Sequence, residues 1–247
     1  MCKKLLCLTT LILVLGLAGM VQATTYYVSP SGNDNNAGTS TSTAWKTTAK
    51  VNSMTFAAGD SILFEGGKTF TAGPEYYTAG TLTVRGGLFF KSGGTPTSPI
   101  TVSSYGSGRA TLYNPYMGTA RWSDTSSGFT IYECGGLNIN NLIFVGAGNT
   151  GNLWQANTGI LLRAEKNYGY KHQHVYIDNV EITDYVGFGI LACTYPDTYD
   201  GWEDVRITNS VIHNVGHTGI NTEGPWPVSG MTYKDFYIAE HYCPVIS

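Results

Sequence analysis

The sequence has few charged residues and no excess of positive charge. Asp, Glu, Lys and Arg make up 13% of its 247 residues, and the formal net charge is −3. Because proteins that hold nucleic acid need a basic field, this composition argues against a nucleic-acid partner. Cysteine is also scarce, and only Cys134, Cys193 and Cys243 lie beyond the N-terminal segment. Three cysteines permit at most one intrachain disulfide, and their spacing fits neither a disulfide framework nor a zinc site.

Helical periodicity is almost absent beyond the N-terminal segment. One short helix is predicted in "STAWKTTAKVNSM", where Ser42 or Thr43 would cap it and Trp45 and Ala49 would share one side. Elsewhere short runs of Val, Ile, Leu, Phe and Tyr are interrupted by Gly, Asn, Asp and Pro. Many brief strands without helices between them predict an all-β protein.

The first residues have the pattern of a secretory signal peptide. Lys3 and Lys4 precede an apolar run from Leu5 to Met20, and cleavage is expected after Ala23, so that residues 1–23 are removed. The alternative is a retained membrane anchor, for which the apolar run is short. The prediction is therefore a secreted, periplasmic or cell-surface protein that does not contact the membrane after cleavage. We expect residues 24–247 to form one domain, a monomer, with an N-terminal cap region at 24–60.

One pattern of residues repeats between positions 130 and 247. Val175, Ile177, Ile182 and Ile190 each recur 30 residues later, at Val205, Ile207, Ile212 and Ile220. Between the preceding unit and the unit of Val175, the offset is 38 for Leu137, Ile139 and Phe144 but 30 for Ile160. The difference places an eight-residue insertion between Gly146 and Thr158. A fourth unit begins at Phe236 and Ile238. Repeats of this length are typical of a solenoid.

Each unit contains three short strands, which wind most simply into a parallel β-helix. Equivalent strands of successive turns would then pair about 4.8 Å apart. Asn141, Asn179 and Asn209 occupy the same position of each unit, and we expect them to stack at one tight corner. The alternative fold, a Greek-key sandwich, would not produce an in-register repeat.

Three segments carry a resemblance to a known family: "TYYVSPSGNDNNAGTSTSTAWKTTAKVN", "GDSILFEGGKTF" and "PITVSSYGSGRATL". They resemble secreted bacterial proteins of the pectate lyase-like superfamily, which implies a right-handed, single-stranded parallel β-helix whose N-terminal strand and short helix cap one end. The superfamily includes polysaccharide lyases and glycosidases, so the resemblance implies a polysaccharide partner without naming the reaction. Its members continue for more turns, and we therefore expect this sequence to be truncated near its C-terminus.

Candidate site residues are those that interrupt the aliphatic pattern of the third strand. If the aligned isoleucines point inward, two outward columns form, Arg163–Cys193–Glu223 and Leu161–Leu191–Asn221. The resemblance implies that a long substrate lies along this face. The turns before the strand hold Asp184, Tyr185, His213, Asn214 and His217, and the segments after it hold Glu165, Lys166 and Trp226.

Two chemistries suit this collection. A lyase needs a base and a cation that neutralises a uronate carboxylate. Arg163 would neutralise that carboxylate, and Lys166 or His217 would be the base. Asp184 and Glu223 would offer oxygens to Ca²⁺. A glycosidase needs two carboxyl groups about 5–9.5 Å apart, such as Glu223 with Asp184 or Glu165. Asn221, Trp226 and Tyr185 are the predicted substrate-binding residues. No metal ligand set can be assigned from the sequence.

Each candidate also has a structural interpretation. His217 would be a turn residue bonded to backbone, Glu223 a solvated carboxylate, and Arg163 the partner of Glu165 or Glu133. The His172-x-His174 pair lacks further ligands at a set spacing, and "SGNDNNAGT" can be an ordinary polar loop. Three functions therefore remain open: a lyase or hydrolase acting on a polysaccharide, a non-catalytic glycan-binding β-helix, and an incomplete fragment of an enzyme.

Overall fold

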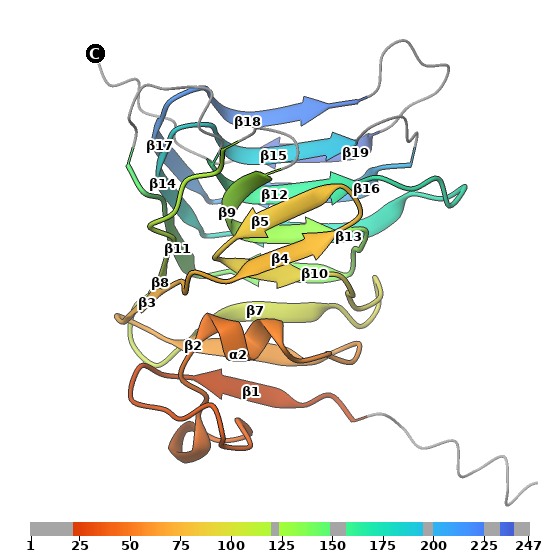
Figure 1. Cartoon of the computed structure of the whole chain (residues 1–247). Helices are drawn as coiled ribbons and strands as arrows, with labels where there is room; N and C mark the ends of the chain where they lie inside the picture. Colours follow the sequence, from red (N-terminus) through yellow and green to blue (C-terminus); the bar gives the residue numbers. More distant parts are fainter. Residues whose placement is uncertain (1–21, 120–123, 149–156, 195–199, 225–232, 240–247) are drawn as a thin grey trace, which may run out of the picture.

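The computed structural model describes residues 22–119, 124–148, 157–194, 200–224 and 233–239. In these residues the chain winds through three sheets in turn, and each circuit stacks on the one before (Figure 1). The fold is therefore the predicted parallel β-helix. Residues 1–21, most of the predicted signal peptide, lie outside the described residues. Within the described part, no helix is long and apolar enough to cross a membrane.

Each sheet collects strands from successive circuits. The first sheet comprises β1 (Thr25–Val28), β2 (Ser61–Glu65), β7 (Ile100–Tyr105), β10 (Leu137–Asn140), β13 (His172–Asp178), β16 (Trp202–Thr208) and β19 (Lys234–Ala239). The second comprises β3 (Thr69–Thr71), β8 (Ala110–Tyr113), β11 (Leu142–Val145), β14 (Glu181–Tyr185) and β17 (Val211–Val215). The third comprises β4 (Tyr76–Ala79), β5 (Leu82–Arg85), β6 (Leu88–Phe90), β9 (Asp124–Tyr132), β12 (Asn157–Ala164), β15 (Phe188–Thr194) and β18 (Thr218–Glu223).

The pairing register confirms the repeat. Val175 pairs with Val205, Ile182 with Ile212 and Ile190 with Ile220, all at the offset of 30. The offset of 38 holds for Leu137 with Val175 and for Phe144 with Ile182, while Ile160 pairs with Ile190. The first residues of the fourth unit also pair as predicted, Phe236 with Val205 and Ile238 with Ile207.

A column of glycines at the start of the third sheet explains one fixed position of the repeat. A Cβ on Gly159 would lie 2.5 Å from the carbonyl oxygen of Gly189, and a Cβ on Gly189 would lie 2.5 Å from that of Gly219. The same two Cβ atoms would also meet the side chains of Ile182 and Ile212. Successive circuits therefore approach each other here more closely than any side chain allows.

The asparagine corner lies between the first and second sheets. Asn141, Asn179 and Asn209 have φ of 55°, 50° and 49°, the left-handed conformation that asparagine tolerates better than most residues. The Nδ2 of Asn179 donates to Oδ1 of Asn141 at 3.3 Å, whereas Nδ2 of Asn209 donates to Oδ1 of Asp178 at 2.7 Å. The predicted stack is present, and an aspartate takes over the amide contact at its last step.

Asn179→Ala should lower the free energy of unfolding by about 1–2 kcal/mol, because alanine has no side-chain amide and is disfavoured at positive φ. Asn179→Gly should cost less, since glycine adopts this conformation freely. Urea unfolding of the two variants measures the difference. Equal stabilities of the alanine and glycine variants would contradict the role of the left-handed backbone.

The predicted N-terminal helix begins later than expected. Instead of one helix capped at Ser42 or Thr43, a 3₁₀ turn η1 (Thr41–Thr43) capped by Ser40 precedes the short helix α2 (Thr48–Asn52), which Thr47 caps. Trp45 lies between the two, where it is buried and pairs with Val28 through an isolated β-bridge. Backbone pairing with β1 thus positions the buried Trp45 side chain at this end of the coil.

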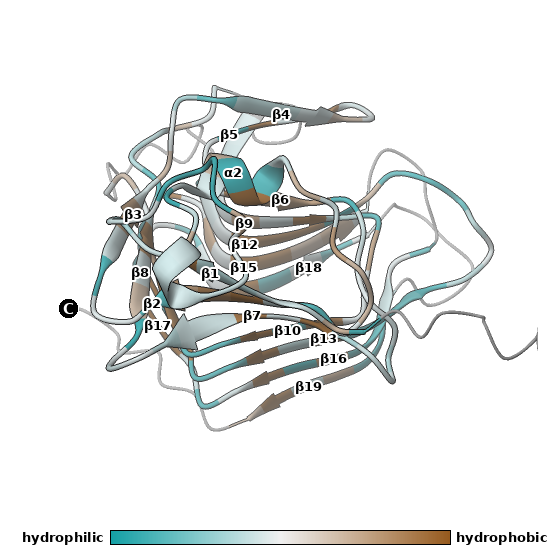
Figure 2. Ribbon diagram, turned by 90° about the horizontal axis from the view of Figure 1, so that it is seen from below, coloured by the Kyte–Doolittle hydropathy of each residue, from teal (hydrophilic) through white to brown (hydrophobic). Residues whose placement is uncertain are grey.

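The core fills the interior of the coil, and a hairpin lies outside it. Inward-pointing aliphatic and aromatic side chains from all three sheets form one continuous cluster. Strands β4 and β5 pair antiparallel, in contrast to the parallel pairing of the coil. In Figure 2 this hairpin lies beyond β9, β12 and β15, on the outer face of the third sheet.

Candidate functional site

The predicted columns of the third sheet are present. Arg163 pairs with Cys193 and Cys193 with Glu223, while Leu161 pairs with Leu191 and Leu191 with Asn221. On the preceding circuit the first column continues to Tyr132, which pairs with Arg163. Stacking of these residues on the outer face is therefore confirmed.

Most of this face, along which a long substrate was expected to lie, is closed to solvent. Leu161, Arg163, Leu191 and Cys193 are all buried. The apolar members form a second cluster, separate from the core, with side chains of the β4–β5 hairpin and its neighbours: Leu82, Val84, Phe89, Tyr132, Leu161, Phe188, Leu191 and Cys193. The hairpin covers the face that the repeat alone leaves exposed (Figure 1).

Arg163 is held in a buried ion pair and does not face solvent as predicted. Its Nη2 lies 2.9 Å from Oε1 of Glu165, its Nε donates to the same oxygen at 3.0 Å, and its Nη1 donates to Sγ of Cys193 at 3.6 Å. Its side chain is 1% exposed. Burial opposes the charge, but Cys193 and Glu165 outweigh it and raise the pKa of Arg163. The alternative interpretation, pairing with Glu165, is what the structure shows.

Glu165 attaches the tip of the hairpin to the third sheet. Its carboxylate accepts hydrogen bonds from the backbone N–H and the hydroxyl of Thr81, both at 2.7 Å, and from the Tyr132 hydroxyl at 3.1 Å. Burial alone would raise the pKa of Glu165, but the bonds from Thr81 and Arg163 lower it overall. Glu165 is therefore an ionised acceptor that joins a strand of the coil to a loop 84 residues away.

Because the folded-state pKa of Glu165 is depressed, its contribution to stability is present above the unfolded pKa and is lost as the pH falls through the folded one. We expect the free energy of unfolding to fall from about pH 4.5 downward. Glu165→Gln should flatten this acid limb, since the amide does not titrate. Denaturant titrations of both proteins between pH 3 and 7 measure the difference. Acid limbs of equal slope would contradict the assignment.

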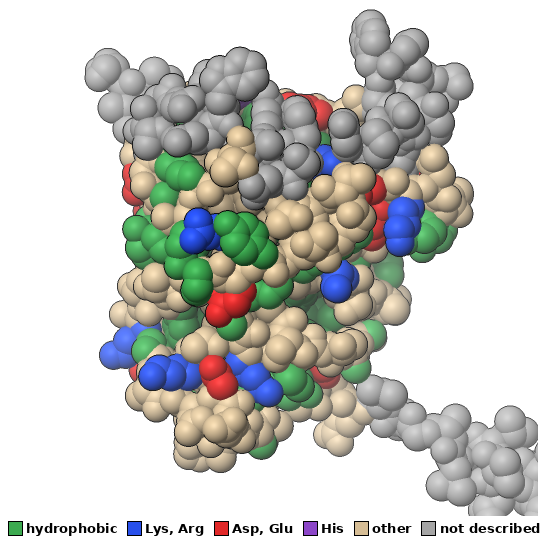
Figure 3. Space-filling view, in the orientation of Figure 1, with side chains coloured by type: hydrophobic (Ala, Val, Ile, Leu, Met, Phe, Trp, Pro, Cys, Tyr) green, Lys and Arg blue, Asp and Glu red, His purple; other side chains and the backbone are tan. Residues whose placement is uncertain are grey.

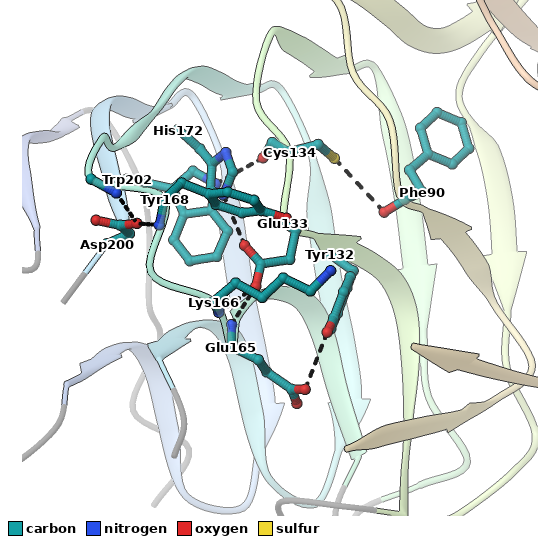
Figure 4. A network of polar contacts seen from close by, with 11 residues as sticks. Phe90, Tyr132, Glu133, Cys134, Glu165, Lys166, Tyr168, His172, Asp200 and Trp202 are labelled. Atoms are coloured by element: carbon teal, nitrogen blue, oxygen red, sulfur yellow. Dashed lines mark hydrogen bonds and ion pairs between the residues drawn. The ribbon is translucent and has the colours of Figure 1, made fainter. Parts of the chain in front are cut away.

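A second buried carboxylate, Glu133, organises the corner between the third and first sheets (Figure 4). Its Oε1 accepts from the backbone N–H of Lys166 at 2.7 Å and from that of Glu165, and its Oε2 lies 3.0 Å from Nε2 of His172. On the next circuit Asp200 accepts from the backbone N–H groups of Tyr168 and Gly169. These carboxylates satisfy loop backbone, so neither is a free acid or base.

The open part of the third-sheet face lies at its β15–β18 end. Glu223 is half-buried, and its Oε1 accepts from Nδ2 of Asn221 at 2.8 Å. His217 is exposed; its Nδ1 lies 2.7 Å from the Thr218 hydroxyl, and its ring lies 4.8 Å from that of Phe188. Asn221 and Glu223 lie on β18 and Phe188 lies on the paired strand β15, while His217 immediately precedes β18. We call His217, Asn221 and Glu223 the open patch.

The remaining predicted residues lie elsewhere. Tyr185, predicted to bind substrate, is fully buried within the core of the coil, where burial raises the pKa of its hydroxyl. Asp184 lies within β14 with a left-handed φ of 63°, and its carboxylate accepts from Nδ2 of Asn214 on β17. Lys166 is exposed, with its Nζ 6.0 Å from the Tyr168 ring at the Glu133 corner. Trp226 lies outside the described residues.

The two polar motifs have structural roles. In "SGNDNNAGT", Asp34 accepts hydrogen bonds from the backbone N–H groups of Lys46 and Thr47 and from the Thr47 hydroxyl, so the loop uses its carboxylate internally. His172 bonds to Glu133, whereas His174 bonds to Asn138. Over the described ranges, no group of three or more His, Cys, Asp or Glu side chains is arranged to hold a metal ion.

The sequence predicts the two columns because they depend on the strand register. It does not predict that the β4–β5 hairpin covers them. Thr81 carries no sequence signal for its contact with Glu165, because it lies in the turn of the β4–β5 hairpin, which is not part of the repeat. Figure 3 shows that charged side chains are scattered over this side of the molecule, without a broad field of one sign. A long charged groove is therefore not evident on the described surface of this side.

Comparisons with known proteins find similarity to a lacto-N-biosidase and a rhamnogalacturonan lyase. No family model matches the sequence. Over 87 residues, 34% of this chain, it is 40% identical to a lacto-N-biosidase of Bifidobacterium longum subsp. longum, a match that spans 5% of that protein. The crystal structure of a native GH136 lacto-N-biosidase from Eubacterium ramulus shares 20% identity and superposes with a TM-score of 0.69, over 89% of this chain and 41% of the other.

A rhamnogalacturonan lyase has the same type of fold. Its structure superposes with a TM-score of 0.54 at 14% identity, over 91% of this chain and 66% of the other. At these identities the structural likeness concerns the fold alone. This chain spans less than half of the lacto-N-biosidase structure and about two thirds of the lyase.

Proposed function

We propose that this protein is an exported glycan-active β-helix protein that hydrolyses glycosidic bonds at the open patch. The observation that carries the proposal is Glu223, a partly exposed carboxylate oriented by Asn221 on the third-sheet face. A partly exposed carboxyl group can donate a proton to a leaving glycosidic oxygen. Export follows from the predicted signal peptide at residues 1–23.

Two observations favour hydrolysis over elimination. Elimination at a uronate requires a cation beside the substrate carboxylate, and the predicted cation, Arg163, is buried and paired with Glu165. The sequence match of 40% identity is to a protein named as a lacto-N-biosidase, a glycoside hydrolase. Both support glycoside hydrolysis, with an oligosaccharide or polysaccharide as substrate.

The alternative is glycan binding without catalysis. A glycosidase uses two carboxyl groups about 5–9.5 Å apart. On the described part of this face the second carboxylate is Glu165, and Arg163, Thr81 and Tyr132 already engage it. A role as proton donor is closed to Glu165 because these bonds favour its ionised form.

The test is a panel of pectin, rhamnogalacturonan, arabinogalactan and a p-nitrophenyl lacto-N-bioside, incubated with the full chain. Release of reducing ends or nitrophenol without a rise in absorbance at 235 nm is the expected result. A rise at 235 nm, which reports unsaturated uronates, would establish elimination instead. Retention of the protein by a glycan without bond cleavage would establish the binding alternative.

A further inference from the structure

The outer face of the first sheet carries a column of planar side chains that the proposed hydrolytic site does not use. Tyr176 on β13 pairs with Arg206 on β16, and Arg206 pairs with Tyr237 on β19. The guanidinium of Arg206 lies 4.6 Å from the centre of the Tyr176 ring. At the end of the column Tyr237 is 58% exposed. An aromatic face is thus presented to solvent on β19.

A repeated backbone distortion places charged groups beside this column. His174, Asp204 and Asp235 have φ of 63°, 55° and 53° at one position of three successive circuits. A non-glycine residue in this conformation costs on the order of 1–3 kcal/mol, and such strain recurs at binding sites. Here it occurs three times on one face, each time next to a member of the column.

The side chains around Asp204 are fixed before any ligand arrives. One oxygen of Asp204 accepts from the Tyr176 hydroxyl at 2.7 Å, and the other accepts from Nε of Arg206 at 3.0 Å. The His174 ring stacks on Tyr176 with 3.8 Å between ring centres, and its Nε2 lies 3.0 Å from Oδ1 of Asn138. Side chains held in this way lose little further conformational entropy on binding.

Next to these groups lies an open hollow of about 380 Å³, lined by Asp204, Arg206, Asp235, Phe236 and Tyr237. Its volume is in the range of about 300–1,000 Å³ typical of small-molecule sites. The lining combines an exposed aromatic ring with a guanidinium and two carboxylates. A sugar ring offers the matching chemistry, because its C–H face stacks on an aromatic ring while its hydroxyls bond to charged groups.

We propose that this hollow, which we call the first-sheet hollow, binds a sugar ring of the glycan as a second site, separate from the open patch. In Figure 2, β13, β16 and β19 lie on the opposite side of the coil from the β4–β5 hairpin and the third-sheet face. The inference rests on the proposed function only in taking a glycan as the ligand. A second site on another face would hold a polymer at the protein surface while the open patch acts on it.

The experiment measures retention by a polysaccharide in native affinity gel electrophoresis, with arabinogalactan, pectin and rhamnogalacturonan as separate probes. The background is Glu223→Gln, so that no probe is cleaved. Tyr237→Ala and Asp204→Asn should each weaken retention about tenfold, the loss expected from one aromatic contact or one charged hydrogen bond. The matched control is Tyr170→Ala, because Tyr170 is equally exposed, at 58%, but lies outside the hollow.

Circular dichroism and melting temperature establish that each variant is folded, and Asp204→Asn provides a second reading if Tyr237→Ala is unstable. Three outcomes would overturn the second site: both variants retain the wild-type affinity for the polysaccharide, Tyr170→Ala weakens retention equally, or no probe retains the protein. A change in oligomeric state of Tyr237→Ala with unchanged retention would also overturn it, because the face would then join copies of this chain. Retention that depends on the hollow, together with no cleavage of any glycan by the wild-type protein, would contradict the proposed hydrolysis and leave the second site intact.

Discussion

Arg163→Met should lower the free energy of unfolding by about 3–5 kcal/mol, because it leaves the carboxylate of Glu165 buried without its cation. Methionine retains much of the apolar stem of arginine, so the fall in the free energy of unfolding measures mainly the loss of the guanidinium charge. At roughly 2–4 °C per kcal/mol for a protein of this size, the melting temperature should fall by about 10 °C. Chemical and thermal unfolding followed by circular dichroism measure both quantities.

The control is the double variant Arg163→Met/Glu165→Gln. The single amide oxygen of glutamine can still accept one of the two Thr81 hydrogen bonds, and the side chain carries no charge, so the double variant should recover part of the lost stability. Arg206→Met, an arginine that is 53% exposed, should cost less than about 1 kcal/mol. Strictly additive effects of the two single substitutions would contradict a coupled buried pair.

The coil itself could be predicted because its spacing is recorded in the sequence. In a stacked fold each circuit pairs with its neighbour, so Ile182 lies over Ile212 only if the same offset also aligns Val175 with Val205. The N-terminal helix was placed less well. Several Ser and Thr residues there are suitable caps, and the one that acts, Thr47, is held by Asp34.

The site could be predicted only in part, because the repeat specifies which residues share a face but not what covers that face. Arg163, Cys193 and Glu223 stack as expected. The β4–β5 hairpin then covers the first two and stops short of the third, through contacts such as that of Thr81 with Glu165. Such contacts join segments that share no pattern, so Arg163 and Glu223 looked equivalent in the sequence and differ in the folded protein.

The first-sheet hollow could also be predicted from the sequence only in part. His174 and Asp204 are separated by the repeat offset of 30, so their stacking could be inferred from the sequence. The left-handed backbone that turns them toward Tyr176 and Arg206 leaves no comparable pattern. The sequence signal that marks the hollow is a polar residue at one repeat position of the first sheet: His174, Asp204 and Asp235.

Glu223→Gln should reduce glycan hydrolysis by about 10²–10⁴-fold, the usual contribution of a general acid or base. The substitution keeps the size of the side chain and an oxygen that can accept from Nδ2 of Asn221, so the fold and the local geometry should be retained. Initial rates of reducing-end release, or of nitrophenol release from a p-nitrophenyl lacto-N-bioside, measure the effect.

Glu75→Gln is the matched control for this loss, since Glu75 is an exposed carboxylate next to the β4–β5 hairpin and lies outside the open patch. Glu75→Gln should hydrolyse the glycan at the wild-type rate. Glu223→Gln should keep the wild-type melting temperature but hydrolyse the glycan much more slowly. A Glu223→Gln protein with more than half of the wild-type activity would remove Glu223 from the reaction. Because Arg163 and Glu165 are engaged with each other, the chemistry would then have to come from groups outside the third-sheet columns.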